Sequence, residues 1–300
     1  MTRSSRDRAR SIHERQFYAL NRAVGRFGIR SFRPQIMAAP HWHGHVEFNY
    51  LENASMTYDV DGRVVELPPG RLALFWAGVP HQLTAVTPVG EAPPRLTNLY
   101  LPLDAFLFMP HVAALQITLL NGGLALMPEA VCDAATLDRW YRDYRSNDVE
   151  RVEILKMELN AMLRRGLLGG IDWLLGDPGA ESGRTQAPAH AHHVVAMIRF
   201  IVENLAEPMS NADIAAATGL HENYATTLFS RAMRLPPKQF LIRMRLLRAR
   251  ALLMESGTPV TAIAAASGFS SSSQFYAHFR AAYGMPPQVM RDRYMAMTLR

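Results

Sequence analysis

Histidine and carboxylate side chains gather in one short segment, His41–Glu47 (HWHGHVE), and His81 follows later in the chain. Histidines that alternate along a strand share one face of a sheet. With Glu47 and His81 they offer the imidazole and carboxylate ligands that suit Fe, Mn or Zn. The same side chains could instead bond a small polar ligand, or could be purely structural. We favour the polar ligand, with His41, His43, Glu47 and His81 among its contacts.

Two tryptophans, Trp42 and Trp76, lie close to these residues in the sequence. An aromatic ring stacks well on the apolar side of a sugar ring, although a tryptophan on a strand can equally belong to a core. We predict that Trp42 and Trp76 line the ligand site, and the role in the core stays open as the alternative.

Short strands must position these side chains, and the sequence between about Pro34 and Leu103 supplies them. Runs of β-forming residues alternate there with turn signals such as Asp61-Gly62. This spacing predicts a small β-barrel or jelly roll. From about Asp104 the apolar residues recur at helical spacing, so helices follow the strands.

The stretch Pro69–His81 resembles the second conserved strand pair of cupin barrels. The pattern of metal-binding cupins is not fully met. Glu47 follows His45 by only two residues, where that pattern has a wider gap, and no asparagine follows His81 at the expected place. We therefore expect a ligand pocket that needs no metal ion or other cofactor.

The whole chain is expected to be an α+β protein in four parts. Residues 1–30 form a basic arm, and residues 31–175 form a cupin-like β-barrel with following helices that binds an effector and oligomerises. Residues 176–189 are rich in glycine and contain proline and serine, so they form a linker. Residues 190–300 form an all-helical domain.

An internal repeat marks the helical domain. The first copy is Ile214–Leu220 (IAAATGL) and the second is Ile263–Phe269 (IAAASGF). A phenylalanine and a proline pair follow each copy, namely Phe229 with Pro236-Pro237 and Phe279 with Pro286-Pro287. The small residues let two helices approach, and the glycine takes the left-handed conformation that the turn requires. The repeat therefore predicts two helix-turn-helix units joined by a long helix.

Bulk properties narrow the class of protein further. From residue 190 onward, twelve lysines and arginines stand against six acidic residues, so this part carries the whole formal charge of +6. Such a basic region suits a polyanion. Neither a membrane span nor a secretory signal is visible, and the single cysteine, Cys132, fits a reducing cytoplasm. Because no nucleophile–base arrangement and no phosphate-binding glycine loop occurs, we do not expect an enzyme.

The segment Gly268–Phe275 (GFSSSSQF), followed by Phe279-Arg280, Tyr283–Pro287 (YGMPP) and Arg291, resembles the signature of AraC/XylS-type transcription regulators. The resemblance covers residues 190–300. It implies a seven-helix domain whose two recognition helices enter successive major-groove segments of double-stranded DNA.

The signature also implies which side chains of the recognition helices face outward. They are Asn223, Thr226 and Thr227 in the first helix, and Ser272, Ser273, Gln274 and Ala277 in the second. Asparagine and glutamine can bond adenine, and a threonine methyl can touch the thymine methyl. Flanking arginines, namely Arg231, Arg234 and Arg280, are expected to hold phosphates.

Within this family, His41–Glu47, Leu74–Ala77 and Pro80–Thr84 resemble regulators that respond to melibiose, as do Asn223–Ala225 and Ser271–Ser273. That resemblance implies an activator whose barrel binds a small sugar, melibiose or another α-galactoside. The expected partners are double-stranded DNA, the sugar, RNA polymerase and a second copy of the chain in a homodimer, with no membrane involved. The alternative function is a metal-dependent cupin enzyme fused to a DNA-binding domain.

Overall fold

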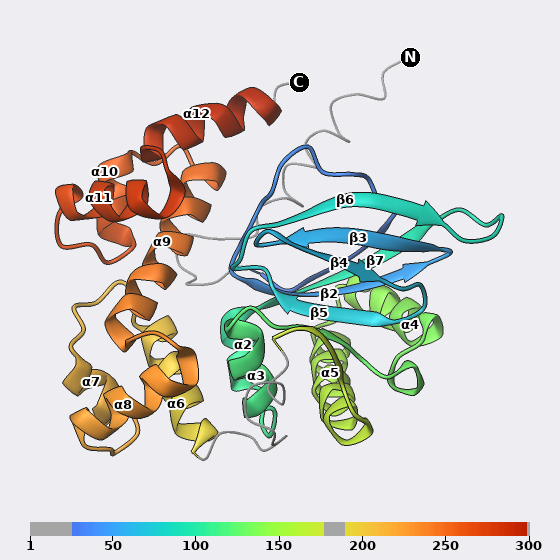
Figure 1. The fold of residues 1–300 in the computed structure, drawn as a ribbon, viewed down its shortest axis with the longest axis horizontal. Helices are drawn as coiled ribbons and strands as arrows, with labels where there is room; N and C mark the ends of the chain where they lie inside the picture. The colour runs from blue at the N-terminus through green and yellow to red at the C-terminus, as the bar shows by residue number, and fades with distance from the viewer. Residues whose placement is uncertain (1–25, 177–189, 299–300) are drawn as a thin grey trace. The chain divides into compact units, whose positions relative to one another are not determined.

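The chain divides into two compact units in a computed structural model, which describes residues 26–176 and 190–298 (Figure 1). The first unit contains Phe27–Val195, and the second contains Ala196–Arg231 and Leu235–Arg300. Residues 1–25 of the predicted basic arm and 177–189 of the predicted linker lie outside the described residues.

Antiparallel strands of the first unit form two sheets. The larger sheet is ordered β1 (Gly28–Phe32), β7 (Arg95–Pro102), β2 (His45–Glu52), β5 (Leu72–Trp76), β8 (Leu124–Leu126) and β9 (Asp172–Leu175). The smaller is ordered β4 (Arg63–Leu67), β3 (Ala54–Val60) and β6 (His81–Pro88). The described strands thus form two facing sheets and not a closed barrel. The last three residues of the predicted arm, Gly28 to Arg30, already belong to β1.

Local sequence explains the smaller sheet. Alternate residues of β3 are buried, beginning with Ala54 and Met56, and the polar residues between them are half-exposed. The hairpin predicted at Asp61-Gly62 is confirmed, since it joins β3 to β4. Asp61 and Gly62 have φ of 53° and 77°, and the Gly62 amide donates to Asp59 Oδ1 at 2.8 Å.

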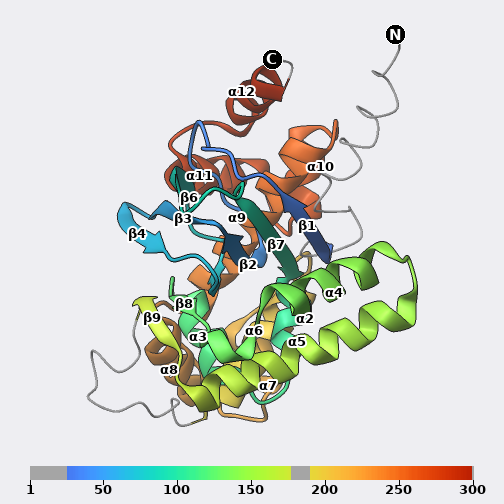
Figure 2. The same ribbon diagram turned by 90° about the vertical axis from the view of Figure 1, so that its right-hand side faces the viewer.

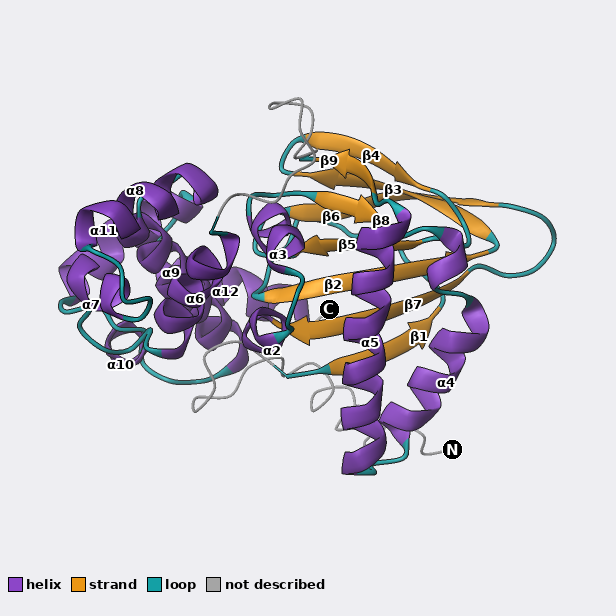
Figure 3. Cartoon of the chain, turned by 90° about the horizontal axis from the view of Figure 1, so that it is seen from below, coloured by secondary structure: helices purple, strands orange, loops and turns teal. Residues whose placement is uncertain are grey.

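An apolar core lies between the two sheets. Its side chains include Leu51, Phe75 and Leu96 from the larger sheet, with Met56, Tyr58 and Leu83 from the smaller one. The other face of the larger sheet is covered by helices (Figure 3). They are α2 (Leu103–Phe108), α3 (Ala113–Leu120), α4 (Ala134–Arg145) and α5 (Val149–Gly169), of which α4 and α5 lie side by side (Figure 2).

The second unit is helical. Seven helices occupy the described residues from 191 onward: α6 (Ala191–Glu203), α7 (Asn211–Ala216), α8 (Glu222–Met233), α9 (Pro237–Glu255), α10 (Val260–Ala266), α11 (Ser272–Tyr283) and α12 (Pro287–Thr298). In Figure 1 the long helix α9 runs from the pair α7–α8 to the pair α10–α11. The predicted α+β class, and the predicted order of a β-rich part and a helical part with two helix-turn-helix units, are confirmed. No helix in the described ranges has the length and apolarity needed to cross a bilayer.

Candidate functional site

The histidine cluster, which we define as His41, His43, Glu47 and His81, lies where the segment leading into β2 meets the start of β6. Backbone hydrogen bonds hold the two segments together. His41 N donates to His81 O at 3.0 Å, His81 N donates to His41 O at 2.9 Å, and His43 N donates to Ala77 O at 2.7 Å. Residues from both sheets therefore meet at this point.

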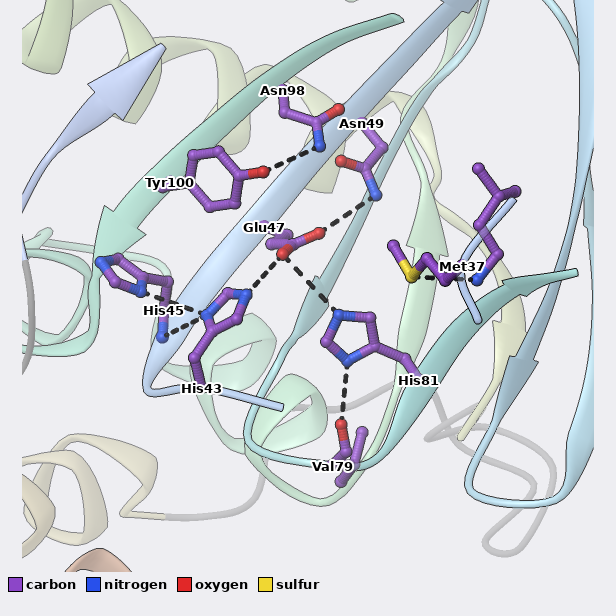
Figure 4. A network of polar contacts seen from close by, with 10 residues as sticks. Met37, His43, His45, Glu47, Asn49, Val79, His81, Asn98 and Tyr100 are labelled. Atoms are coloured by element: carbon purple, nitrogen blue, oxygen red, sulfur yellow. Dashed lines mark hydrogen bonds and ion pairs between the residues drawn. The ribbon is translucent and has the colours of Figure 1, made fainter. Parts of the chain in front are cut away.

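The side chains of His43, Glu47 and His81 converge (Figure 4). His43 Nε2 lies 2.6 Å from Glu47 Oε1, and His81 Nε2 lies 3.7 Å from the same oxygen. One nitrogen or oxygen atom from each of the four residues falls within 4.8 Å of all the others. His81 is fully buried and Glu47 nearly so. The structure therefore brings together four of the six side chains predicted for the ligand site.

The ring nitrogens of His81 and His43 that face away from Glu47 make hydrogen bonds that orient the two imidazoles. The Val79 carbonyl oxygen can only accept, so His81 Nδ1, 3.0 Å away, carries the proton and donates it. His81 Nε2, the other ring nitrogen, faces Glu47. His43 Nδ1 lies 3.1 Å from His45 Nδ1, so His45 stands behind His43 and outside the cluster.

Glu47 is held as a carboxylate. Burial by itself would raise the pKa of this side chain, but the nearby imidazoles of His43 and His81 outweigh burial, and the pKa lies well below its ordinary value. A buried anion facing imidazoles can serve either a cation or a ligand that donates hydrogen bonds.

A second group of polar side chains extends from Glu47 across β2 and β7; we call Glu47, Asn49, Asn98 and Tyr100 the polar row. Asn49 pairs with Asn98, and Glu47 pairs with Tyr100, so all four share one face of the sheet. Asn49 Nδ2 donates to Glu47 Oε2 at 3.3 Å, and Asn98 Nδ2 donates to Tyr100 Oη at 3.2 Å (Figure 4). The Oδ1 atoms of both asparagines are buried without a hydrogen-bond partner among the described residues.

The sequence-based prediction missed the three members of the row beyond Glu47. The signal was present, because Asn49 follows Glu47 at the two-residue spacing that keeps side chains on one face. Asn98 and Tyr100 show the same spacing on the partner strand. Finding them required the pairing of β2 with β7, which joins residues about fifty positions apart.

The prediction that Trp76 lines the ligand site is contradicted by the strand register. Trp76 pairs with Val46, whereas Glu47 pairs with Phe75, so Trp76 points to the opposite face of the sheet. It is fully buried there and its ring lies against Gly78. Trp42 is half-buried between two cluster histidines in the chain, and its role stays a prediction.

The structure also corrects the spacing used to judge the cupin pattern. That comparison counted from His45, but the histidines that meet Glu47 are His41 and His43. Counted from His43, Glu47 follows after four positions, a wider gap than the two positions from His45.

The helix-turn-helix units have the features that their repeats predicted. Gly219 and Gly268 take φ of 67° and 87°, in the left-handed region. Ala215 and Ala264 are each 2% exposed, at the helix crossings. The predicted base-reading side chains lie on α8 and α11 and are exposed, except for the half-buried Thr226. Their contacts with DNA, and those of exposed Arg231, Arg234 and Arg280, stay predictions.

Two arginines counted in the basic excess are used inside the second unit. Arg245 donates to the carbonyl oxygens of Leu205 and Glu207 at 2.8 and 2.6 Å. Arg291 donates to those of Leu253 and Thr258 at 3.2 and 2.6 Å. Since these arginines tie loops to helices, the count of cations overstates the charge available to a polyanion.

Comparison with known proteins matches both units. Residues 25–159 match the description "AraC-like ligand binding domain", and residues 214–293 match "Helix-turn-helix domain". The melibiose operon regulatory protein of Escherichia coli K12 is 31% identical over 269 residues, covering 89% of this chain and 87% of that protein. The transcriptional activator RhaS of Escherichia fergusonii is 32% identical over 140 residues, covering 47% of this chain and 45% of its own.

A solved structure shares the fold over both units. ToxT from Vibrio cholerae O395 covers 88% of this chain and 96% of its own, with a TM-score of 0.50 and 11% identity. The relatives are transcription regulators and not enzymes, which sets aside the alternative of a cupin enzyme. The domain matches and the relative that spans most of both chains show that the protein belongs to the AraC family of ligand-binding, DNA-binding transcription regulators.

Proposed function

We propose that this regulator responds to a small sugar, melibiose or another α-galactoside, which binds on the face of the larger sheet that carries the polar row. The observation that carries the proposal is the pair of buried, unpartnered oxygens of Asn49 and Asn98. Buried polar atoms without partners are costly, so such atoms favour a ligand that supplies the missing bonds. Sugar hydroxyls can donate to both amide oxygens and to Glu47.

Similarity supports the sugar class. The relative at 31% identity carries melibiose in its name, and the similarity covers the segments that contain the cluster and the row. A sugar needs several hydrogen-bonding groups next to apolar surface, and here the apolar surface comes from core side chains such as Phe75 and Tyr58. Trp76 has no part in this proposal.

We propose further that the sugar-bound protein activates transcription. In this scheme a homodimer places two DNA-binding units on paired half-sites, and the exposed residues of α8 and α11 read the bases. RNA polymerase is the partner that an activator of this kind recruits. Coupling requires that the sugar bind more tightly to one of two arrangements of the protein.

Isothermal calorimetry on the full-length protein tests the sugar. We expect binding of melibiose, weaker or no binding of a β-galactoside such as lactose, and persistence of melibiose binding in chelator. Asn98→Leu removes the amide and should weaken binding about tenfold, the equivalent of one net hydrogen bond of roughly 1.4 kcal/mol.

Thr84→Ala is the matched control, because its exposed hydroxyl donates to the Thr57 carbonyl on the smaller sheet. Its affinity for melibiose should equal that of the wild type. Equal loss in both variants, or no heat with any α-galactoside, would contradict the proposed effector.

A further inference from the structure

We propose that the histidine cluster binds one divalent first-row transition-metal ion, with three imidazole nitrogens and one carboxylate oxygen as ligands. The four ligand atoms already lie within 4.8 Å of one another. Metal–nitrogen distances of about 2.0–2.1 Å place two ligands of one ion roughly 3.3 Å apart at the tetrahedral angle and roughly 4 Å apart when opposite. Small side-chain rotations therefore suffice to close the site.

The bonds behind His81 favour a metal ligand over a structural histidine. A histidine that binds a metal commonly donates its other ring N–H to a backbone carbonyl, which fixes the tautomer. His81 does so through Nδ1 and the Val79 oxygen. Its Nε2 is buried, has no hydrogen-bond partner within the described ranges, and points into the cluster. An ion would give that nitrogen the partner it lacks.

The chemistry of the ligands selects the class of ion. Three neutral imidazoles and one carboxylate carry a single negative charge, which a dication more than neutralises. Imidazole suits Zn, Fe, Co and Ni, whereas Mg and Ca prefer oxygen ligands throughout. The sequence favoured a metal-free pocket because the spacing of Glu47 from His45 and the absence of an asparagine after His81 depart from the metal-binding cupin pattern. The geometry of the four ligand atoms is our reason to depart from that expectation.

An ion bound at this position would link the two sheets. His41 and His43 precede β2, Glu47 lies on β2, and His81 opens β6, so the ion would join the two sheets at one end. Glu47 also accepts from Asn49, the next member of the polar row. The ion is inferred from the four ligands alone and does not depend on the proposed effector.

Metal titration of the full-length, chelator-stripped protein tests the inference without any sugar. We expect one Co²⁺ per chain with a ligand-field spectrum of nitrogen and oxygen donors, Zn²⁺ competition for that site, and a higher melting temperature with metal. Glu47→Gln should weaken binding by at least the roughly 10–100-fold that loss of an outer-shell partner costs. Circular dichroism checks folding, and His41→Ala, at a half-buried position, provides a second variant.

A group of histidines elsewhere requires a matched control. His190, His192 and His193 lie close together at the start of α6, with ring centroids 4.0–6.3 Å apart, and could capture ions adventitiously. The triple variant His190→Asn, His192→Gln, His193→Gln should keep the Co²⁺ spectrum and stoichiometry. Loss of binding in that variant, retained binding in both cluster variants, or no stoichiometric binding by the wild type would overturn the inference. Melibiose binding in chelator is a separate measurement, so the two proposals can fail independently.

Discussion

In the first helix-turn-helix unit the turn glycine has open space around it, whereas in the second the same position is enclosed. A Cβ added at Gly219 would meet nothing within 4 Å. A Cβ added at Gly268 would collide with the Leu205 carbonyl oxygen and with the Arg245 guanidinium. Both glycines supply a left-handed turn, but only Gly268 also allows a close approach of the backbone to another segment.

The helices that precede the two turns, α7 and α10, also differ in how their first residues are capped. α7 begins with a capping box, in which Ser210 and Asp213 bond each other's backbone amides at 2.8 and 3.2 Å. α10 begins after Pro259 with no side-chain cap. Its unit is instead packed around aromatic rings at 5.1–5.4 Å, those of Phe269, Phe275 and Phe279. The first helix of the first helix-turn-helix unit is thus held by a side-chain cap, which the first helix of the second unit lacks.

The largest effect that tests this comparison is expected for Gly268→Ala. An alanine in the left-handed region costs about 1–2 kcal/mol. The collision with backbone adds overpacking of about 1–3 kcal/mol. We expect the free energy of unfolding of the whole helical unit, Ala196–Arg231 and Leu235–Arg300, to fall by roughly 3 kcal/mol. Urea unfolding followed by far-UV circular dichroism measures this loss.

Gly219→Ala is the matched control. Its free energy of unfolding should fall only by the cost of placing alanine in the left-handed region, about 1–2 kcal/mol. All four tryptophans lie between residues 42 and 173. Tryptophan fluorescence therefore reports the unfolding of the β-rich unit, Phe27–Val195, separately. Equal losses for the two glycine variants would show that enclosure of Gly268 contributes nothing.

The DNA-binding half could be predicted from sequence because its signals are local. A glycine at positive φ, small residues at a helix crossing and buried phenylalanines recur within short segments, as at Gly219, Ala215 and Phe229. What could not be predicted was the use of Arg245 and Arg291 as links to backbone carbonyls. Those bonds join residues 33–40 positions apart.

The ligand site was predicted less completely, for a physical reason. β5 is buried along its whole length, and β2 along all but its last residue, since one face meets the smaller sheet and the other meets helices. The alternation of apolar and polar residues then cannot tell which face is which. Trp76 was therefore assigned to the wrong face, and Asn49 and Asn98 were overlooked, while the contacts of Glu47 with His43 and His81 were anticipated.

The two recognition helices carry different side chains, and DNA binding can distinguish their contributions. Thr227→Ala on α8 and Gln274→Ala on α11 should each change the preferred sequence, with a cost of about 1–3 kcal/mol at particular base pairs. Ser270 donates to Gln274 Oε1 at 3.1 Å and so orients the amide of Gln274. Binding of the full chain to a library of substituted operators measures both effects.

Arg280→Ala is the contrasting variant, since Arg280 is exposed at the end of α11 and is expected to hold phosphate. It should weaken binding to every sequence alike and reduce the salt slope by about one. A uniform loss for Gln274→Ala would instead assign Gln274 to positioning, and would leave the first helix as the main reader of bases.

The smallest effect concerns the capping box at the start of α7, which α10, the matching helix of the second helix-turn-helix unit, lacks. Ser210→Ala removes the side-chain acceptor for the Asp213 amide, and loss of such a cap costs about 1 kcal/mol. Hydrogen bonds from Ser210 lower the pKa of Asp213 below 3.8, so the capping box contributes stability above that pH and loses it as the pH falls through the lowered pKa. The difference in unfolding free energy between wild type and Ser210→Ala should therefore be full at neutral pH and shrink in acid. A difference that stays constant from neutral pH into acid would mean that the Asp213 carboxylate takes no part in the cap.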